Sequence, residues 1–389
     1  MSKPELITAI REEITRKGPI PFMRYMEMAL YHPRYGYYAS PGEKIGWKGD
    51  YYTSSSVHPV FGELIAKQVL QMRAVCARGD ASNPEEIFTL VEMGAGKGTL
   101  CFDILNTIRR EAPAVFEHLD YVIIEESRWL RDKQAESLRP IFSGRIRWEE
   151  KIPSNLVGLV LSNELLDAFP VHRLRVEGES IEEIYVDWEN SGFVEVLRPP
   201  SSPRLQNYVR RLSVRFDRST ELEVNLQARD WMRQVGRALS RGFVMTIDYG
   251  YPEEELYSPR RPKGTFLCYH QHKTNEDPYV RVGEQDMTAH VDFTSLKQCG
   301  EEVGLRCLGF TDQCHFLMGL GISEKMAGPA DRMDQSTEAR ETFLAMKRLM
   351  APEQMGKVFK ILIQGKNLPA DVHLDGLQFK PFFRFSDAR

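Results

Sequence analysis

Short apolar runs alternate along the chain with stretches in which apolar residues recur at every third or fourth position. The runs are typical of buried strands, and the wider spacing is typical of amphipathic helices. Five runs predict strands of a parallel sheet, over residues 87–91, 121–124, 145–148, 156–161 and 243–247. Helical spacing predicts helices beside them, for example over residues 61–72 and 100–108. The alternation of strands and helices predicts a Rossmann-like α/β fold.

Two segments interrupt this alternation. Residues 171–240 predict a meander of three short antiparallel strands followed by two helices, and residues 251–292 show little regular periodicity. The rest of the chain predicts two helices and two further strands, which we expect to close the sheet as an antiparallel edge pair. The helices are residues 294–303 and 337–350, and the strands are residues 306–310 and 358–364. The sheet then has seven strands.

The first 60 residues predict two helices and an irregular loop. Ser2 and Glu5 have the spacing of a capping box for the first helix. The loop is dense in Gly, Tyr, Asp and Thr and contains Asp50 and Tyr51, so we expect a lid or substrate wall, or an arm packed on the core. The predicted division is an N-terminal region (1–60), a core (61–170, 241–250 and 293–366), two insertions (171–240 and 251–292) and a C-terminal tail (367–389).

Composition narrows the class of protein. The 389 residues are 42% hydrophobic and carry a net charge of −4, which is ordinary for a globular protein and argues against non-specific nucleic-acid binding. No apolar run has transmembrane length, so we expect no membrane insertion. Acidic residues near the N-terminus are atypical of a transit peptide, and we expect a cytoplasmic protein. The six cysteines form no C-x-x-C pair, which predicts reduced thiols.

A glycine loop follows the first predicted strand. Glu92 precedes Gly94, Gly96 and Gly98, and helical spacing begins directly afterwards. Glycines let backbone N–H groups approach a ligand, and a helix start adds partial positive charge. A P-loop would need Lys and then Ser or Thr after its last glycine, and a dinucleotide loop would need glycine where Thr99 stands. The E-x-G-x-G-x-G pattern is that of S-adenosylmethionine (SAM) methyltransferases, because an acid suits the ammonium group of this ligand. A glycine turn without a ligand is the alternative.

Further acids follow the next two strands. Glu125 follows the strand at 121–124, at roughly the interval that a β-α-β unit places before its ribose-binding acid. Ser127 is suited to cap the helix that follows. Glu149 ends the third strand, where an acid commonly meets the adenine amine, although the neighbouring Glu150 leaves this choice open.

The fourth predicted strand ends in Asn163, Glu164 and, three residues on, Asp167. Ligands of open α/β sheets bind outside the carboxyl ends of the strands, so these groups face the reacting methyl group if SAM is bound. Carboxylates suit a cationic acceptor, above all a guanidinium. A helical turn after the strand would place both carboxylates on one side. The alternative is that Glu164 and Asp167 cap that helix.

Five residues are candidates for the substrate side of the site: Asp50, Tyr51, Asp248, Tyr249 and His290. The aspartate and tyrosine at 248 and 249 follow the fifth strand, at the same edge of the sheet as the glycine loop. His290, two further histidines and Asp286 match no metal-binding signature, so we expect no metal and interpret the histidines as pocket-lining or solvated.

Motifs through most of the chain show a family resemblance. They are Gly36-Tyr37-Tyr38, Gly49-Asp50-Tyr51, Phe61-Gly62-Glu63, the loop from Glu92 to Gly98, Glu125 with Ser127, Asn163-Glu164 with Asp167-Ala168, Asp248-Tyr249-Gly250, Gly264-Thr265, the stretch from Asp286 to Phe293, and Met355-Gly356 with Phe359-Lys360. On these motifs the chain resembles the MidA family of SAM-dependent methyltransferases, whose mitochondrial member is a respiratory complex I assembly factor.

The resemblance implies a seven-strand methyltransferase fold with insertions, SAM as cofactor, and ω-N-methylation of arginine in a protein that resembles a complex I subunit. We expect Glu164, Asp167 and Asn163 to act on the acceptor, and Glu92, the glycine loop, Glu125 and Glu149 to bind SAM. Two alternatives stay open: an assembly protein that binds SAM without turnover, and a small-molecule methyltransferase. The sequence does not indicate the oligomeric state.

Overall fold

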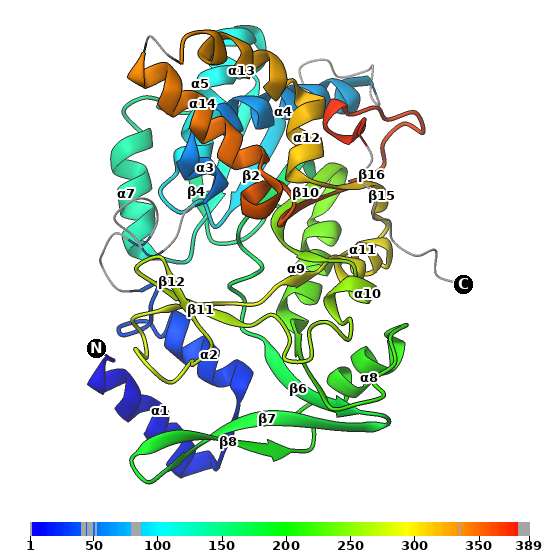
Figure 1. The fold of residues 1–389 in the computed structure, drawn as a ribbon. Coiled ribbons are helices and arrows are strands. Elements are labelled where there is room, and N and C mark those ends of the chain that lie inside the picture. Colours follow the sequence, from blue (N-terminus) through cyan, green and yellow to red (C-terminus); the bar gives the residue numbers. More distant parts are fainter. Residues whose placement is uncertain are drawn as a thin grey trace. The chain divides into compact units, whose positions relative to one another are not determined.

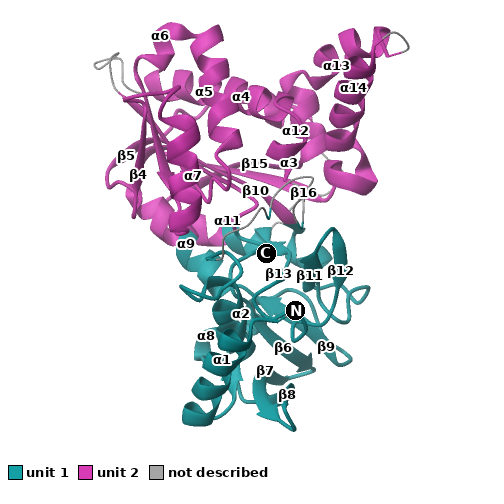
Figure 2. Cartoon of the chain, turned by 90° about the vertical axis from the view of Figure 1, so that its left-hand side faces the viewer, with its two compact units in different colours: residues 1–51, 166–231, 250–296 teal, residues 52–165, 232–249, 297–389 magenta. Residues whose placement is uncertain are grey.

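The structure is a computed structural model, and it describes residues 2–39, 44, 50, 53–78, 87–333 and 336–379. The chain divides into two compact units (Figure 2). Unit 1 comprises residues 1–51, 166–231 and 250–296, and unit 2 comprises residues 52–165, 232–249 and 297–389. The predicted N-terminal region and both predicted insertions contribute most of unit 1, whereas the predicted core contributes most of unit 2.

Unit 2 is built on a sheet of seven strands. They are β2 (Phe88–Met93), β3 (Leu119–Ile124), β4 (Ile146–Glu149), β5 (Leu156–Asn163), β10 (Leu239–Tyr251), β15 (Arg306–Asp312) and β16 (Phe359–Lys366). Their order across the sheet is β15-β16-β10-β5-β2-β3-β4. Strands β2, β4, β10, β15 and β16 are labelled in Figure 1. Strands β10, β5, β2, β3 and β4 run parallel to one another. Strand β16 lies between β10 and β15 and is antiparallel to both. The predicted α/β fold and its antiparallel edge pair are confirmed.

The order of the parallel strands creates a switch point. The chain runs outward from β2 through β3 to β4, and then returns to the other side of β2 to form β5 and β10. The connections after β2 and after β5 therefore leave the sheet in opposite directions from two adjacent strands. In open α/β sheets, this is the place where ligands bind.

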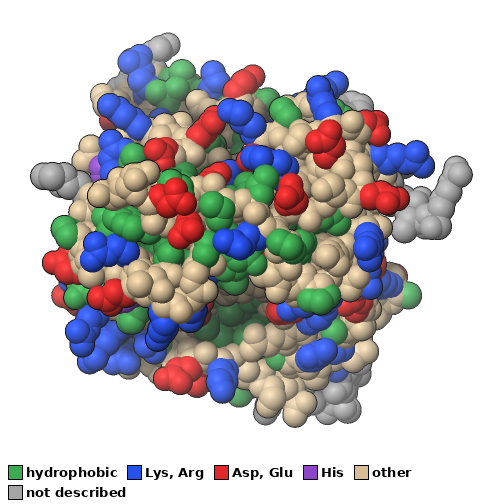
Figure 3. All heavy atoms as spheres, turned by 90° about the horizontal axis from the view of Figure 1, so that it is seen from below, with side chains coloured by type: hydrophobic (Ala, Val, Ile, Leu, Met, Phe, Trp, Pro, Cys, Tyr) green, Lys and Arg blue, Asp and Glu red, His purple; other side chains and the backbone are tan. Residues whose placement is uncertain are grey.

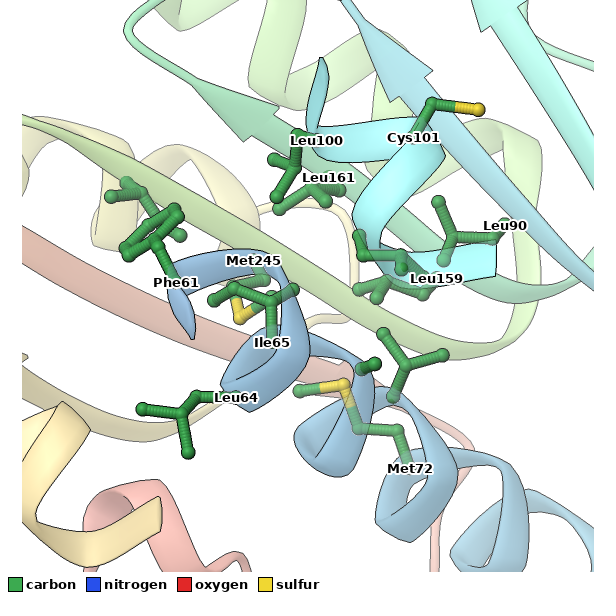
Figure 4. Packing of buried hydrophobic residues seen from close by; sticks show 14 of the residues in the cluster. Phe61, Leu64, Ile65, Met72, Leu90, Leu100, Cys101, Leu159, Leu161 and Met245 are labelled. Carbon is green, nitrogen blue, oxygen red and sulfur yellow. The ribbon is translucent and has the colours of Figure 1, made fainter. Parts of the chain in front are cut away.

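The helices of unit 2 cover the sheet. They are α3 (Ser54–Val57), α4 (Val60–Arg78), α5 (Thr99–Glu111), α6 (Pro113–Phe116), α7 (Arg128–Leu138), α12 (Gln313–Leu320), α13 (Ile322–Asp331) and α14 (Thr337–Met350), with the short turns η1 (Pro352–Gly356) and η2 (Asp375–Leu377). Figure 4 shows how α4 packs: Ile65 and Met72 lie against Leu159 of β5 and Met245 of β10. All four side chains are buried. Each such residue contributes roughly 1.5–3 kcal/mol when fully buried, and the packed core fixes the strand ends that carry the site.

Unit 1 contains an antiparallel sheet, in which the order is β1-β7-β6-β9 and β8 pairs with β7. Its strands are β1 (Ile20–Pro21), β6 (His172–Glu177), β7 (Ser180–Glu189), β8 (Gly192–Arg198) and β9 (Thr220–Val224). The predicted meander corresponds to β6, β7 and β8. Helices α1 (Pro4–Lys17) and α2 (Phe22–Tyr31) pack on this sheet through a buried cluster that includes Leu6, Ile10 and Tyr25.

The rest of unit 1 is shorter. It contains α8 (Pro203–Arg211), α10 (Glu253–Leu256), the strands β11 (Leu267–His270), β12 (Lys273–Asn275) and β13 (Asp286–Thr288), and β14 (Val291–Asp292), which pairs with the last residues of β10. The strands β12, β11 and β13 form an antiparallel sheet, although residues 251–292 show little periodicity in the sequence. Helices α9 (Leu226–Ala238) and α11 (Phe293–Glu301) are divided between the two units.

The predicted capping box at the N-terminus is wrong. The N-cap of α1 is Lys3, and no side chain caps the helix there. The hydroxyl of Ser2 instead accepts a hydrogen bond from the backbone N–H of Val282, at 3.0 Å. The helix begins with Pro4, which needs no capping partner because it has no N–H.

Surface and cysteine features agree with the composition. Side chains of both charge signs are interspersed on the face in Figure 3. All six cysteines are free thiols, and Cys76, Cys101, Cys268 and Cys299 are buried. Among the helices that the structure describes, none is both long and apolar enough to cross a membrane. In the same residues, no three His, Cys, Asp or Glu side chains are grouped to hold a metal ion.

Candidate active site

The glycine loop lies between the end of β2 and the start of α5. Gly94, Gly96 and Gly98 all have a positive φ, of 70°, 55° and 78°. A side chain at Gly94 would lie 2.8 Å from Leu165, and one at Gly98 would lie 2.9 Å from Leu138. Glycine is therefore required both by backbone conformation and by space. Gly98 is the N-cap of α5 and provides no side chain, so the loop leads directly into the start of a 13-residue helix.

Glu92 lies at the base of this loop and is buried. The hydroxyl of Tyr121, on the adjacent strand β3, donates a hydrogen bond to Oε2 of Glu92 at 2.7 Å. Burial raises the pKa of Glu92 to about 7, and the nearby Glu125 adds to this effect, while the Tyr121 hydroxyl opposes it. A buried carboxylate with a raised pKa gains most from a cationic partner. The environment therefore suits the ammonium group predicted for it.

Glu125 follows β3 and faces the same loop region. Its Oε1 accepts the backbone N–H of Ser127 at 2.9 Å. Burial raises its pKa to about 7, against the lowering effects of the Ser127 N–H and of Gln134. Ser127 also caps α7, since its hydroxyl accepts the N–H of Leu130 at 3.4 Å, as predicted. Glu125 is thus held at a fixed helix start.

Glu149 ends β4 at the edge of the sheet. Its side chain is 44% exposed and accepts a hydrogen bond from Arg147 at 2.5 Å. Arg147 also binds Asp120 on β3. Glu149 therefore already takes part in a surface ion pair, and its contact with adenine stays a prediction.

Glu164 follows β5 directly and has a left-handed backbone, with φ of 54°. Its Oε1 accepts the backbone N–H of Ser54 at 2.8 Å and the side-chain amide of Asn163 at 3.1 Å. Its Oε2 accepts the hydroxyl of Tyr249 at 3.2 Å. Burial raises the pKa of Glu164 to about 8, and the charge of Asp248 contributes, while the three donors lower it. Three hydrogen bonds thus hold this carboxylate in place at the switch point.

No helix follows β5, because residues 164–170 form turns. The helical turn that would have placed both carboxylates on one side is therefore not formed by these residues, and the alternative in which Glu164 and Asp167 cap a following helix is wrong. The left-handed residue at 164 turns the chain away from the helical path. The side chain of Glu164 instead meets the start of α3, a helix that lies 110 residues earlier in the chain.

Two buried polar residues, Ser54 and Gln313, support the contact with Glu164, and no local sequence pattern indicates either of them. The hydroxyl of Ser54 donates to Oε1 of Gln313 at 2.9 Å, and Nε2 of Gln313 donates to the carbonyl of Leu349 at 2.9 Å. Both Ser54 and Gln313 are fully buried. These bonds tie the start of α12 and the end of α14 to the segment that positions Glu164.

Asp248 and Tyr249, at the end of β10, have different roles in the structure. Both carboxylate oxygens of Asp248 accept backbone N–H groups, from Tyr249 at 2.9 Å and from Leu165 at 3.2 Å. Asp248 therefore holds the turn after β5 against the end of β10. The ring of Tyr249 packs on Phe359, with 4.2 Å between centroids, and presents its hydroxyl to Glu164.

The other predicted site residues belong to unit 1, apart from Tyr51, which lies outside the described residues. The side chain of Asp167 is buried, and its carbonyl accepts the N–H of Ala289 at 3.0 Å. Asp50 accepts hydrogen bonds from the Tyr37 hydroxyl and from the N–H of Gln271, both at 2.7 Å.

His290, also in unit 1, has its ring centroid 5.4 Å from that of Tyr251. The backbone N–H of His290 donates to the hydroxyl of Thr265 at 3.0 Å. It lines a small buried cavity together with Tyr208, Tyr257 and Asp292. The substrate-side roles of His290, Asp50 and Asp167 stay predictions.

Strand order and site together define a class of protein. A glycine loop after the first parallel strand, an acid at the end of each of the first two, and a polar turn at the switch point make the SAM-dependent methyltransferase arrangement. Comparison with known proteins supports this class. The model of a family of S-adenosyl-L-methionine-dependent methyltransferases matches residues 64–311, and the chain belongs to this family.

Individual relatives extend the match. The chain is 30% identical to the Drosophila melanogaster protein arginine methyltransferase NDUFAF7 homolog, mitochondrial, over 95% of this chain and 86% of that protein. It is 25% identical to human protein arginine methyltransferase NDUFAF7, mitochondrial, over 89% of this chain and 80% of that one. A crystal structure of a COG1565 superfamily member from Burkholderia thailandensis, bound to S-adenosyl-homocysteine, superposes with a TM-score of 0.84 at 30% identity, over 97% of both chains.

The protein is thus a SAM-dependent methyltransferase, and the residues at the switch point fit its cofactor. Three glycines with positive φ let the loop turn closely at the end of β2, and buried Glu92 suits a cation. Glu125, at the next strand end, offers an acceptor for hydroxyl groups. When bound, SAM supplies an electrophilic methyl group.

Proposed function

We propose that the protein is a protein arginine N-methyltransferase. The observation that carries the proposal is the Glu164 carboxylate, held by donors from Ser54, Asn163 and Tyr249 directly after β5. Strand β5 pairs with β2, and Met93, at the end of β2, is the partner of Ser162. Glu164 therefore leaves the sheet on the strand next to the one that carries the glycine loop.

The chemistry of arginine fits this carboxylate. A guanidinium remains protonated in water, with a pKa of roughly 12.5 or more, so its nitrogen is a weak nucleophile. A carboxylate that accepts two guanidinium N–H groups fixes the plane of the group and stabilises its charge. Positioning of this kind can contribute on the order of 7–11 kcal/mol to lowering a barrier. We assign an orienting role to Glu164. Its Oε1 already accepts hydrogen bonds from Ser54 and Asn163, so a guanidinium N–H would bind Oε2, with Asp167 as a second acid.

The protonation of Glu164 adds a pH dependence. With a pKa of about 8, the group is largely protonated at neutral pH in the free protein. A cationic acceptor favours the ionised form, because an opposite charge lowers the pKa of a carboxyl group. A cationic acceptor therefore gains more from an ionised Glu164 than an uncharged acceptor does.

The relatives support a protein acceptor, since both named above are protein arginine methyltransferases. The resemblance to the MidA family further implies a partner that resembles a subunit of respiratory complex I, and we propose such a partner. We also propose a cytoplasmic location.

The test is transfer from SAM that carries a labelled methyl group, in an extract of cells that lack the protein. Our proposal predicts that the label enters a protein band, and that amino-acid analysis of the band finds methylated arginine. Label in a small metabolite would support a small-molecule methyltransferase instead. Binding of SAM without any transfer would support an assembly protein. Label on another amino acid would contradict the arginine assignment.

A further inference from the structure

A single buried side chain, Gln134 in α7, connects three parts of the cofactor site. Its Nε2 donates to the carbonyl of Gly96 at 2.8 Å and, more weakly, to Oε2 of Glu125 at 3.4 Å. Its Oε1 accepts the indole N–H of Trp148 at 2.9 Å. Gln134 is fully buried. One amide thus reaches the glycine loop, the acid that follows β3, and a residue of β4.

The contacts of the Gln134 amide can form in only one of its two orientations. A glutamine amide has two N–H donors and one carbonyl acceptor. The two donors point to a carbonyl and a carboxylate, and the acceptor points to an indole N–H. If the amide were rotated by 180°, its oxygen would meet two other oxygens and its nitrogen would meet the donor of Trp148. The neighbours therefore fix the rotamer as well as the position of the amide.

The bond to Gly96 bears directly on the shape of the loop. A peptide unit is planar, so fixing the carbonyl of Gly96 also fixes the plane that contains the following N–H. Gly96 has φ of 55°, in the left-handed region that glycine adopts readily, so its backbone alone does not fix the orientation of this carbonyl. Helix α7 also lies close to Gly98, because a side chain at that position would lie 2.9 Å from Leu138 and 3.4 Å from Gln134.

We propose that Gln134 is a positioning residue for the cofactor, which holds the glycine loop, Glu125 and Trp148 in the arrangement that binds SAM. Loss of the amide would release the Gly96 carbonyl and leave buried polar groups unsatisfied, which is costly in a protein interior. The inference depends on SAM as the cofactor and not on the identity of the acceptor.

The experiment is calorimetric titration of the whole protein with S-adenosyl-homocysteine. Gln134→Met keeps the length of the side chain and removes all its hydrogen bonds, and we expect its Kd to rise about tenfold or more. Trp148→Phe removes one of the three contacts, and a smaller rise is expected. The matched control is Lys133→Met, on the same helix, where the side chain is 56% exposed and pairs only with Glu136 among the ion pairs that the structure describes. Its Kd should equal that of the wild type.

Gln134→Glu provides a readout that loss of packing would not give. A protonated carboxyl group can still donate to Gly96 and accept from Trp148, whereas an ionised one would repel both the Gly96 carbonyl and Glu125. The ratio of its Kd to that of the wild type should therefore rise from about pH 6 to about pH 8.5. If Gln134→Met does not fold, this ratio decides the question. A constant ratio, or a Kd of folded Gln134→Met within about twofold of the wild type, would overturn the proposal.

Discussion

Removal of one hydroxyl, in Tyr249→Phe, tests the electrostatics of the proposed acceptor site. The hydroxyl of Tyr249 donates to Oε2 of Glu164 at 3.2 Å, while the ring packs on Phe359. Phenylalanine retains the ring and its packing, so the fold should survive. The change removes one of the three donors that stabilise the ionised form of Glu164.

The expected size of the shift in the pKa of Glu164 follows from the geometry of this hydrogen bond. A hydrogen bond to a charged group contributes about 1.5–3 kcal/mol, and a length of 3.2 Å is long for an O–H donor, so the lower value of about 1.5 applies. Since 1.36 kcal/mol corresponds to one pKa unit, the pKa of Glu164 should rise by about one unit from its value of about 8. Removing a donor to the carboxylate disfavours the charged form, so the shift is upward.

The assay is the pH dependence of kcat/KM for methyl transfer, which reports ionisations of the free enzyme. If Glu164 acts as a carboxylate, the rate of the wild type should rise as the pH increases through about 8. The midpoint of Tyr249→Phe should lie about one unit higher, with about tenfold lower activity near neutral pH and recovery in alkali. Affinity for S-adenosyl-homocysteine should not change. An unshifted midpoint in a folded variant would refute the reasoning.

Two further substitutions separate cofactor binding from transfer. Gly94→Ala forces a side chain into a left-handed conformation 2.8 Å from Leu165, which costs about 1–2 kcal/mol; calorimetry should show about tenfold weaker binding of S-adenosyl-homocysteine, and unchanged binding would contradict the assigned cradle. Gln313→Leu removes the group that accepts a hydrogen bond from the hydroxyl of Ser54. The backbone N–H of Ser54 in turn donates to Glu164. Transfer should fall about tenfold with the affinity for S-adenosyl-homocysteine intact, and an equal loss of both would show that Gln313 is only structural.

The sheet could be predicted from the sequence because its strands are local apolar runs. The run at residues 156–161 is buried on both faces in β5, and no polar pattern obscures it. The same holds for β2 and β3. Strand β9 (Thr220–Val224) was missed although Glu221 and Glu223 alternate with Leu222 and Val224, because the run has only 5 residues and does not pair with the preceding strand β8 through a hairpin. Its pairing with β6 is a tertiary contact that no local pattern indicates.

The candidate site was predictable only where a residue is part of a local motif. The glycine loop and Glu92 are recognisable because spacing and residue type together imply a ligand. Gln134 and Gln313 are ordinary helix residues in the sequence, and their importance comes from partners on other elements. The path of the chain after Asn163 could not be predicted, because Glu164 adopts a left-handed conformation that is uncommon for residues other than glycine.

The most direct test of the account is methyl transfer by Glu164→Gln, measured at saturating SAM beside binding of S-adenosyl-homocysteine. Glutamine keeps the shape of the side chain and removes its charge, so it cannot balance a guanidinium. The account predicts that binding is retained within about threefold and that transfer falls by about 100-fold or more. Wild-type transfer rates in a folded, cofactor-binding Glu164→Gln protein would contradict it.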